Sequence, residues 1–193
     1  MNFPALPASH RLVKTIDLQQ DKRLSLRLNA VSVSLCAALI SLMALFCPLE
    51  LFPAGADTVW EYAAPALLLV VLSAAYVLLH ELVHGLFFHL YSKDRVRFGF
   101  HFLYAFAGMP NWYFDRRSYL VIGLSPIVLL GLALLLPLFF LQGSWFWIVY
   151  LIEVLNLSGS AGDLYVFYWM IRLPNDLLIN DDGMSMRFYT RQD

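Results

Sequence analysis

The chain has 193 residues, of which 60% are hydrophobic and only 14% are charged. Soluble domains have about 45–50% apolar and about 25% charged residues, so this composition excludes an ordinary soluble domain and indicates an integral membrane protein. The length suits one compact unit rather than two domains. The net charge of -1 is uninformative by itself. We expect the lipid bilayer, and no nucleic acid, as a partner.

Four apolar segments follow a polar leader, which covers residues 1–27. At 1.5 Å per residue, a helix of about 20 residues crosses a hydrocarbon core of about 30 Å. We therefore expect a membrane domain over residues 28–172 and a tail over residues 173–193. The expected spans cover about residues 28–46, 63–90, 119–141 and 145–171.

The basic residues predict the orientation of these spans. All 13 Lys and Arg residues lie in the leader, between spans two and three, or from Arg172 onward. Loops that carry such residues stay in the cytoplasm, so both termini are expected there.

The segment between spans two and three contains an expected β-hairpin. Residues 96–106 read VRFGFHFLYAF, which is rich in aromatic residues and β-formers, and residues 108–111 are turn formers. The expected fold is thus an all-α membrane protein with four transmembrane helices and a membrane-associated β-hairpin. The alternative for this segment is a hydrophobic re-entrant loop that seals the bundle.

The motif HELVH, from His80 to His84, lies near the end of the second span. Residues four apart share one helix face, so His80 and His84 can direct two imidazoles at one metal ion while Glu81 stands beside it. Two neutral imidazoles suit Zn²⁺, and the carboxylate of Glu81 could take a proton from a water whose pKa the ion lowers. Ionisable groups inside a span are costly and usually functional.

A third zinc ligand should lie at the same depth in the membrane as His80. Spans two and four both run inward, and Asp163 lies about as far along span four as His80 does along span two. Small residues at 159–162 precede Asp163, and they permit close helix approach or a loosened helix. His80, His84 and Asp163 are therefore the expected ligands, with a fourth position open for water.

The chain resembles a known family at these residues. HELVHGLFF in the second span and NLSGSAGD in the fourth look like the zincin peptidases, small four-span bacterial membrane proteins. That family is similar to the site-2 proteases, which are intramembrane zinc metalloproteases. The resemblance covers residues 63–171. Unlike the site-2 motif, Asp163 is followed by Leu164, and no proline stands nearby.

The resemblance implies a function and a role for each residue. His80, His84 and Asp163 would bind Zn²⁺, Glu81 would be the general base, and Asn156 would steady the substrate or an oxyanion. The expected activity is hydrolysis of a membrane-embedded or membrane-proximal polypeptide near the cytoplasmic face of a bacterial inner membrane. A helical peptide bond is shielded by its own hydrogen bonds, so an unwound substrate could add to an exposed hairpin edge.

Two alternatives use the same polar residues differently. In one, zinc only ties span two to span four in a protein without enzymatic activity. In the other, Glu153, Asp163 and the histidines form a relay in a small transporter or channel. Asn156 can equally form hydrogen bonds that hold neighbouring helices together, and Glu153 can be a protonated, hydrogen-bonded carboxyl group.

Overall fold

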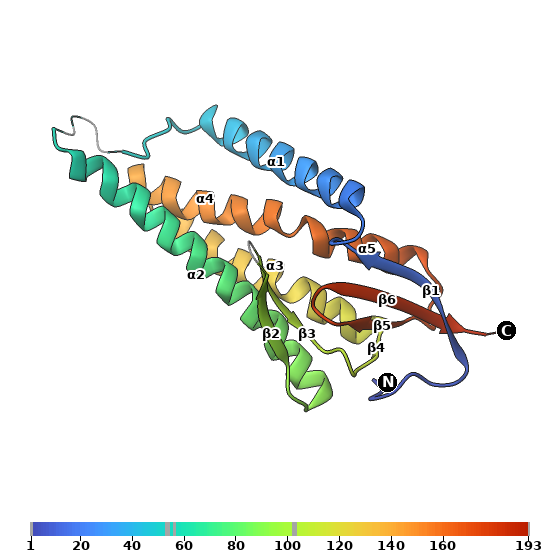
Figure 1. Ribbon diagram of the computed structural model, residues 1–193. Helices are drawn as coiled ribbons and strands as arrows, with labels where there is room; N and C mark the ends of the chain where they lie inside the picture. The colour runs from blue at the N-terminus through green and yellow to red at the C-terminus, as the bar shows by residue number, and fades with distance from the viewer. Residues whose placement is uncertain (1, 53–54, 56, 102–103, 193) are drawn as a thin grey trace. The chain divides into compact units, whose positions relative to one another are not determined.

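The computed structural model describes residues 2–52, 55, 57–101 and 104–192 (Figure 1). The helices in these ranges are α1 (Lys22–Ala44), α2 (Val59–Ser92), α3 (Arg116–Leu138), α4 (Gly143–Gly159) and α5 (Ala161–Arg172). The strands are β1 (His10–Asp17), β2 (Arg97–His101), β3 (Tyr104–Gly108), β4 (Phe114–Asp115), β5 (Leu178–Asp181) and β6 (Ser185–Arg191).

Three of the described helices, α1, α2 and α3, are long and apolar enough to cross a membrane. They include the first three expected spans almost completely. The expected fourth span is instead divided into α4 and α5 around Ser160. Gly159 is a weak helix former, and the hydroxyl of Ser160 bonds the carbonyl of Asn156 at 2.7 Å. Four continuous transmembrane helices are therefore not observed in the described ranges.

The expected all-α fold with one hairpin is incomplete, because the structure also contains a larger sheet. This sheet is antiparallel and four-stranded, in the order β1-β6-β5-β4. Strand β1 from the expected leader pairs with β6 from the expected tail, between His10 opposite Arg191 and Asp17 opposite Ser185. The two ends of the chain therefore fold together.

The structure divides into two compact units, each described by itself. The first contains residues 1–28, 80–126 and 162–193, and the second contains residues 29–79 and 127–161. The core of the first unit forms around fully buried Phe88, Phe114, Ile179 and Phe188. The core of the second forms around Trp147, whose indole N–H donates to the carbonyl of Pro48 at 2.6 Å.

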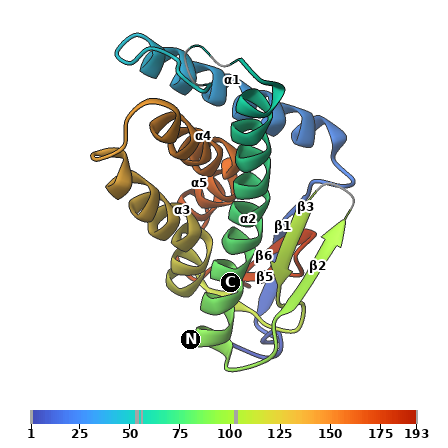
Figure 2. The ribbon, with the colours of Figure 1, turned by 90° about the vertical axis from the view of Figure 1, so that its left-hand side faces the viewer.

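The expected hairpin is present as the antiparallel pair β2–β3. Arg97 lies opposite Gly108, so β2 falls inside the predicted β-rich segment and β3 extends two residues beyond it. The expected turn formers at 108–111 begin with the last residue of β3 and do not join the two strands. Figure 2 shows the pair alongside the C-terminal part of α2. A Cβ added at Gly85 would lie 2.2 Å from the ring of Phe98. Because Gly85 has no side chain, the hairpin can approach α2 immediately after the HELVH motif.

Candidate metal centre

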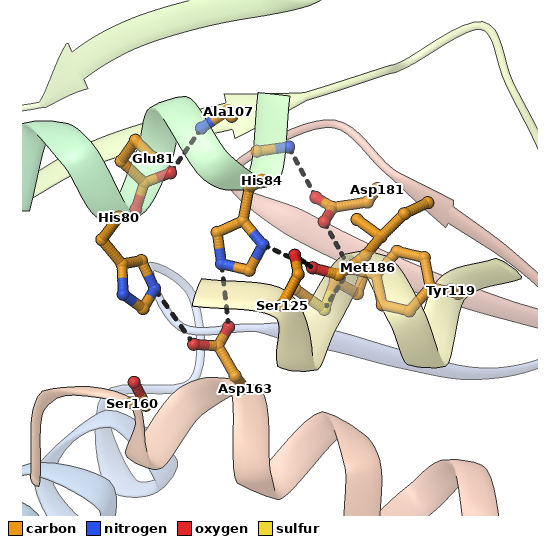
Figure 3. Close-up of polar contacts among 12 residues, drawn as sticks. His80, Glu81, His84, Ala107, Tyr119, Ser125, Ser160, Asp163, Asp181 and Met186 are labelled. Atoms are coloured by element: carbon orange, nitrogen blue, oxygen red, sulfur yellow. Dashed lines mark hydrogen bonds and ion pairs between the residues drawn. The ribbon is translucent and has the colours of Figure 1, made fainter. Parts of the chain in front are cut away.

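Helix α2 presents His80 and His84 on one face, with ring centroids 4.8 Å apart. Helix α5 supplies Asp163, whose two carboxylate oxygens each face one imidazole (Figure 3). The His80 Nε2 atom lies 3.3 Å from Oδ2, and the His84 Nε2 atom lies 3.7 Å from Oδ1. The structure thus brings together the three side chains that the motif and membrane depth predict as metal ligands.

The donor set of these three side chains fits Zn²⁺. Their ligand atoms all lie within 4.8 Å of one another. Tetrahedral zinc with bonds of about 2.0–2.2 Å needs ligand atoms about 3.4 Å apart, so small side-chain movements suffice. Two imidazoles and one carboxylate leave a fourth coordination position open, which is the pattern of a catalytic rather than a filled structural site.

The break between α4 and α5 determines where Asp163 points. Because α5 begins at Ala161, Asp163 lies in the first turn of a new helix. Unpaired N–H groups make this end of a helix favourable for a negative charge. The small residues around Ser160 therefore place a carboxylate at a helix start, where its charge is stabilised.

Glu81 lies beside this centre but is held by the hairpin. The backbone N–H of Ala107 in β3 donates to its Oε2 atom at 2.7 Å. In Figure 3 Glu81 points toward β3, whereas His80 and His84 point toward Asp163. No side-chain motif marks Ala107, so the sequence analysis missed this backbone donor.

The carbonyl of Ile122 in α3 is a second backbone group that the sequence analysis missed. His84 Nδ1 lies 2.9 Å from this oxygen, and the Ser125 hydroxyl donates to it at 3.0 Å. A ligating histidine usually donates its other ring N–H to an oxygen, which fixes the orientation of the ring. Pro126, four residues after Ile122, is the signal in the sequence, because proline has no N–H to donate to that carbonyl.

A buried polar pair lies near this histidine bond (Figure 3). The Tyr119 hydroxyl donates to Asp181, which also accepts the N–H of Gly183 at 2.8 Å. Burial raises the pKa of Asp181 to about 6. A cavity of about 10 Å³, enough for roughly one water, is lined by Asp163, Tyr119 and Met186 among others. Asp163 therefore lines a space that can hold roughly one water molecule.

Asn156, the expected substrate residue, belongs to the second unit. It is fully buried, accepts the Tyr76 hydroxyl at 2.9 Å, and donates to Glu153 and to the carbonyl of Ile127, each at 3.2 Å. These bonds tie α2, α3 and α4 together. A Cβ added at Gly131 would lie 2.8 Å from the amide nitrogen, so this glycine gives the amide room. The substrate role of Asn156 stays a prediction.

Comparison with known proteins supplies a family for this arrangement. No curated protein and no solved structure matches the chain significantly. A family model described as "putative zincin peptidase" matches residues 73–178, more than half of the chain, and this stretch includes the HELVH motif and Asp163. The chain belongs to this family of zincin-type peptidases.

Proposed function

We propose that the protein is a zinc-dependent intramembrane metalloprotease, similar to the site-2 proteases. It would hydrolyse a peptide bond of a membrane-embedded or membrane-proximal polypeptide near the cytoplasmic face of a bacterial inner membrane. The observation that carries this proposal is the convergence of His80, His84 and Asp163, with Glu81 on the next position of the same helix. Membership of a peptidase family and three apolar helices support it.

Each residue of the centre has a distinct task in this reaction. His80, His84 and Asp163 hold the ion, which when bound polarises a carbonyl and lowers the pKa of a water to about 7. Glu81 takes the proton from the attacking water. The water oxygen bonds to the carbonyl carbon, the C–N bond breaks, and Glu81 passes the proton to the leaving nitrogen. Neither a structural zinc site nor an ion relay needs an acid next to the first histidine.

Strand β3 is suited to hold an unwound substrate beside Glu81. The N–H groups of Ala107 and Met109 both point away from β2, since they bond Glu81 and the carbonyl of Asp181. Alternate residues of a strand point the same way, so the N–H of Ala105 faces this side too. We propose that an extended substrate segment bonds this edge at Ala105, because the N–H groups of Ala107 and Met109 already have partners.

Comparison of cells that carry wild-type protein or Glu81→Gln tests the proposed reaction. The substitution removes the base but keeps the size of the side chain, so zinc and substrate can still bind. Quantitative proteomics of the membrane fraction should find polypeptides that remain uncut only with the variant. Purified wild-type protein should then cut these polypeptides in detergent or vesicles, and a zinc chelator should stop the reaction. Identical proteomes and no cleavage in vitro would contradict the proposal.

A second candidate is a small transporter that uses buried polar groups as a relay. The hydrogen-bonded set of Tyr76, Asn156 and Glu153 in the second unit favours it, since buried carboxylates within apolar helices often mark ion paths. Ion flux into reconstituted vesicles that survives zinc chelation, and that Glu153→Gln abolishes, would support this candidate over the protease.

A further inference from the structure

A missing backbone donor in α3 leaves one carbonyl available to the metal centre. In an α-helix the carbonyl of residue 122 would accept the N–H of residue 126. Residue 126 is proline, which has no N–H, so this bond cannot form. The Ile122 oxygen instead lies 2.9 Å from His84 Nδ1 and accepts the Ser125 hydroxyl at 3.0 Å.

The carbonyl specifies which nitrogen of His84 carries the proton. A carbonyl oxygen can only accept, so Nδ1 must carry a proton, and in the neutral ring Nε2 then keeps its lone pair. That lone pair belongs to the atom that faces Asp163 at 3.7 Å. The neutral ring is thus in the tautomer that a metal ligand bound through Nε2 requires.

Burial protects the bond between His84 and the Ile122 carbonyl from competition by water. Ile122 is 0% exposed and Pro126 is also fully buried, so bulk water cannot replace the histidine at the carbonyl. If the ring turned away, the carbonyl would keep only the Ser125 hydroxyl, and the buried Nδ1–H donor would lose its partner, which costs free energy. Rotation of the His84 ring away from the carbonyl is therefore unfavourable even before a metal binds.

We propose that Pro126 is a positioning residue for the metal centre. Because Pro126 has no N–H, the Ile122 carbonyl stays available to His84. The bond to this carbonyl orients the His84 ring so that Nε2 can bind zinc. The inference rests on the metal-binding role in the proposed function. Pro126 touches neither substrate nor ion in this account and acts only through Ile122 and His84.

Zinc affinity of purified variants tests this role. Pro126→Ala introduces an N–H that competes for the Ile122 carbonyl, and loss of such an outer hydrogen bond weakens metal binding by about 10–100-fold. Pro137→Ala is the matched control, since it changes a proline near the C-terminal end of the same helix, eleven residues after Pro126. Competition titration with a zinc chelator should give a weaker Kd for Pro126→Ala and an unchanged Kd for Pro137→Ala. Equal affinities for both variants and wild type would overturn the proposal.

Nuclear magnetic resonance of ¹⁵N-histidine-labelled, zinc-free protein provides a readout that needs neither metal nor peptidase activity. At a pH at which the His84 ring is neutral, the wild-type ring, assigned by comparison with His84→Asn, should carry its proton on Nδ1, and Pro126→Ala should shift the proton toward a mixture of tautomers. A neutral wild-type ring with its proton on Nε2 would overturn the inference even if Pro126→Ala fails to fold. If wild-type protein binds no zinc, the proposed function fails, and the tautomer still decides the role of Pro126.

Discussion

The backbone N–H of Ala107 donates a 2.7 Å hydrogen bond to the Glu81 carboxylate. This bond joins the hairpin to the acidic residue of the HELVH motif. It is charge-assisted and partly buried, so it constrains where the carboxylate can lie. The position of β3 is therefore part of the chemistry proposed for Glu81.

Replacement of Ala107 by proline should reduce peptide hydrolysis by about 10–100-fold without loss of zinc. A hydrogen bond to a charged group contributes about 1.5–3 kcal/mol, and about 1.4 kcal/mol corresponds to a factor of ten in rate. The Ala107 N–H points away from β2, so proline removes no bond between the two strands. Turnover of a polypeptide identified with Glu81→Gln measures the effect.

Ala107→Gly is the control for this experiment, because glycine keeps the N–H that bonds Glu81. Its turnover should stay within a few-fold of wild type. If the proline and glycine variants lose activity equally, the hydrogen bond to Glu81 does not contribute to the reaction.

Gly108→Ala should destabilise the first unit by about 1–3 kcal/mol, the usual cost of overpacking. A Cβ at this position would lie 2.4 Å from the nitrogen of Gly183 and 2.5 Å from the carbonyl carbon of Asp182. Both are backbone atoms of the β5–β6 turn, so β3 must move away from the sheet. Thermal unfolding in detergent measures the loss.

Gly162→Ala is the matched control, since a Cβ there meets no atom within 4 Å. Alanine is the better helix former, so this variant should be as stable as wild type or slightly more stable. Equal stability of Gly108→Ala and Gly162→Ala would mean that β3 does not need its close packing on the turn.

Because of Asp181, the protein should be more stable at mildly acidic pH than at neutral pH. Burial raises its folded pKa to about 6 from the ordinary value of 3.8, so the folded state binds the proton more tightly. This contribution is complete below about pH 4 and is lost as the pH rises through 6. Acidification from pH 7 to pH 5 should add about 1 kcal/mol to the free energy of unfolding.

Asp181→Asn removes this titration while an amide oxygen can still accept the Gly183 N–H. The difference between wild type and variant in unfolding temperature across pH 5–7 isolates the contribution of Asp181. Parallel pH profiles for the two proteins would show that the carboxyl group does not titrate in this range.

Asn156→Ala should lower stability while zinc content stays normal. The substitution removes the bonds that Asn156 makes to the Tyr76 hydroxyl and the Glu153 carboxyl, at about 1 kcal/mol for each hydrogen bond lost. Tyr76→Phe removes a single bond of the same set and should cost about 1 kcal/mol. Unchanged stability of Asn156→Ala together with lost cleavage would instead support a role on the substrate.

The sequence predicts the grouping of His80, His84 and Asp163 better than the contacts around these side chains, for physical reasons. Helical spacing alone places His80 and His84 on one face, and equal membrane depth selects Asp163. The contributions of Ala107 and Ile122 come from backbone atoms, which every residue has, so only tertiary structure distinguishes them. The sequence shows that Pro126 cannot donate a backbone hydrogen bond to the carbonyl of Ile122. It does not show that His84, which lies on another helix, bonds that carbonyl instead.

The four-stranded sheet was harder to foresee than the hairpin. Strands β2 and β3 are close in sequence, and their aromatic composition is visible in one short segment. Strand β1 pairs with β6 across almost the whole chain, from His10 to Arg191, and no local pattern specifies so distant a partner. The division of the fourth span at Ser160 was signalled by small residues, but those also suit close helix packing.

Zinc content of detergent-purified protein tests the central claim most directly. Wild type, His80→Ala, Asp163→Ala and Glu81→Gln are compared under conditions that do not strip metal. We predict one zinc per wild-type chain, its loss in the His80 and Asp163 variants, and its retention in Glu81→Gln. Wild-type protein without zinc, or with zinc that survives both ligand substitutions, would contradict the metal centre on which the proposed protease depends.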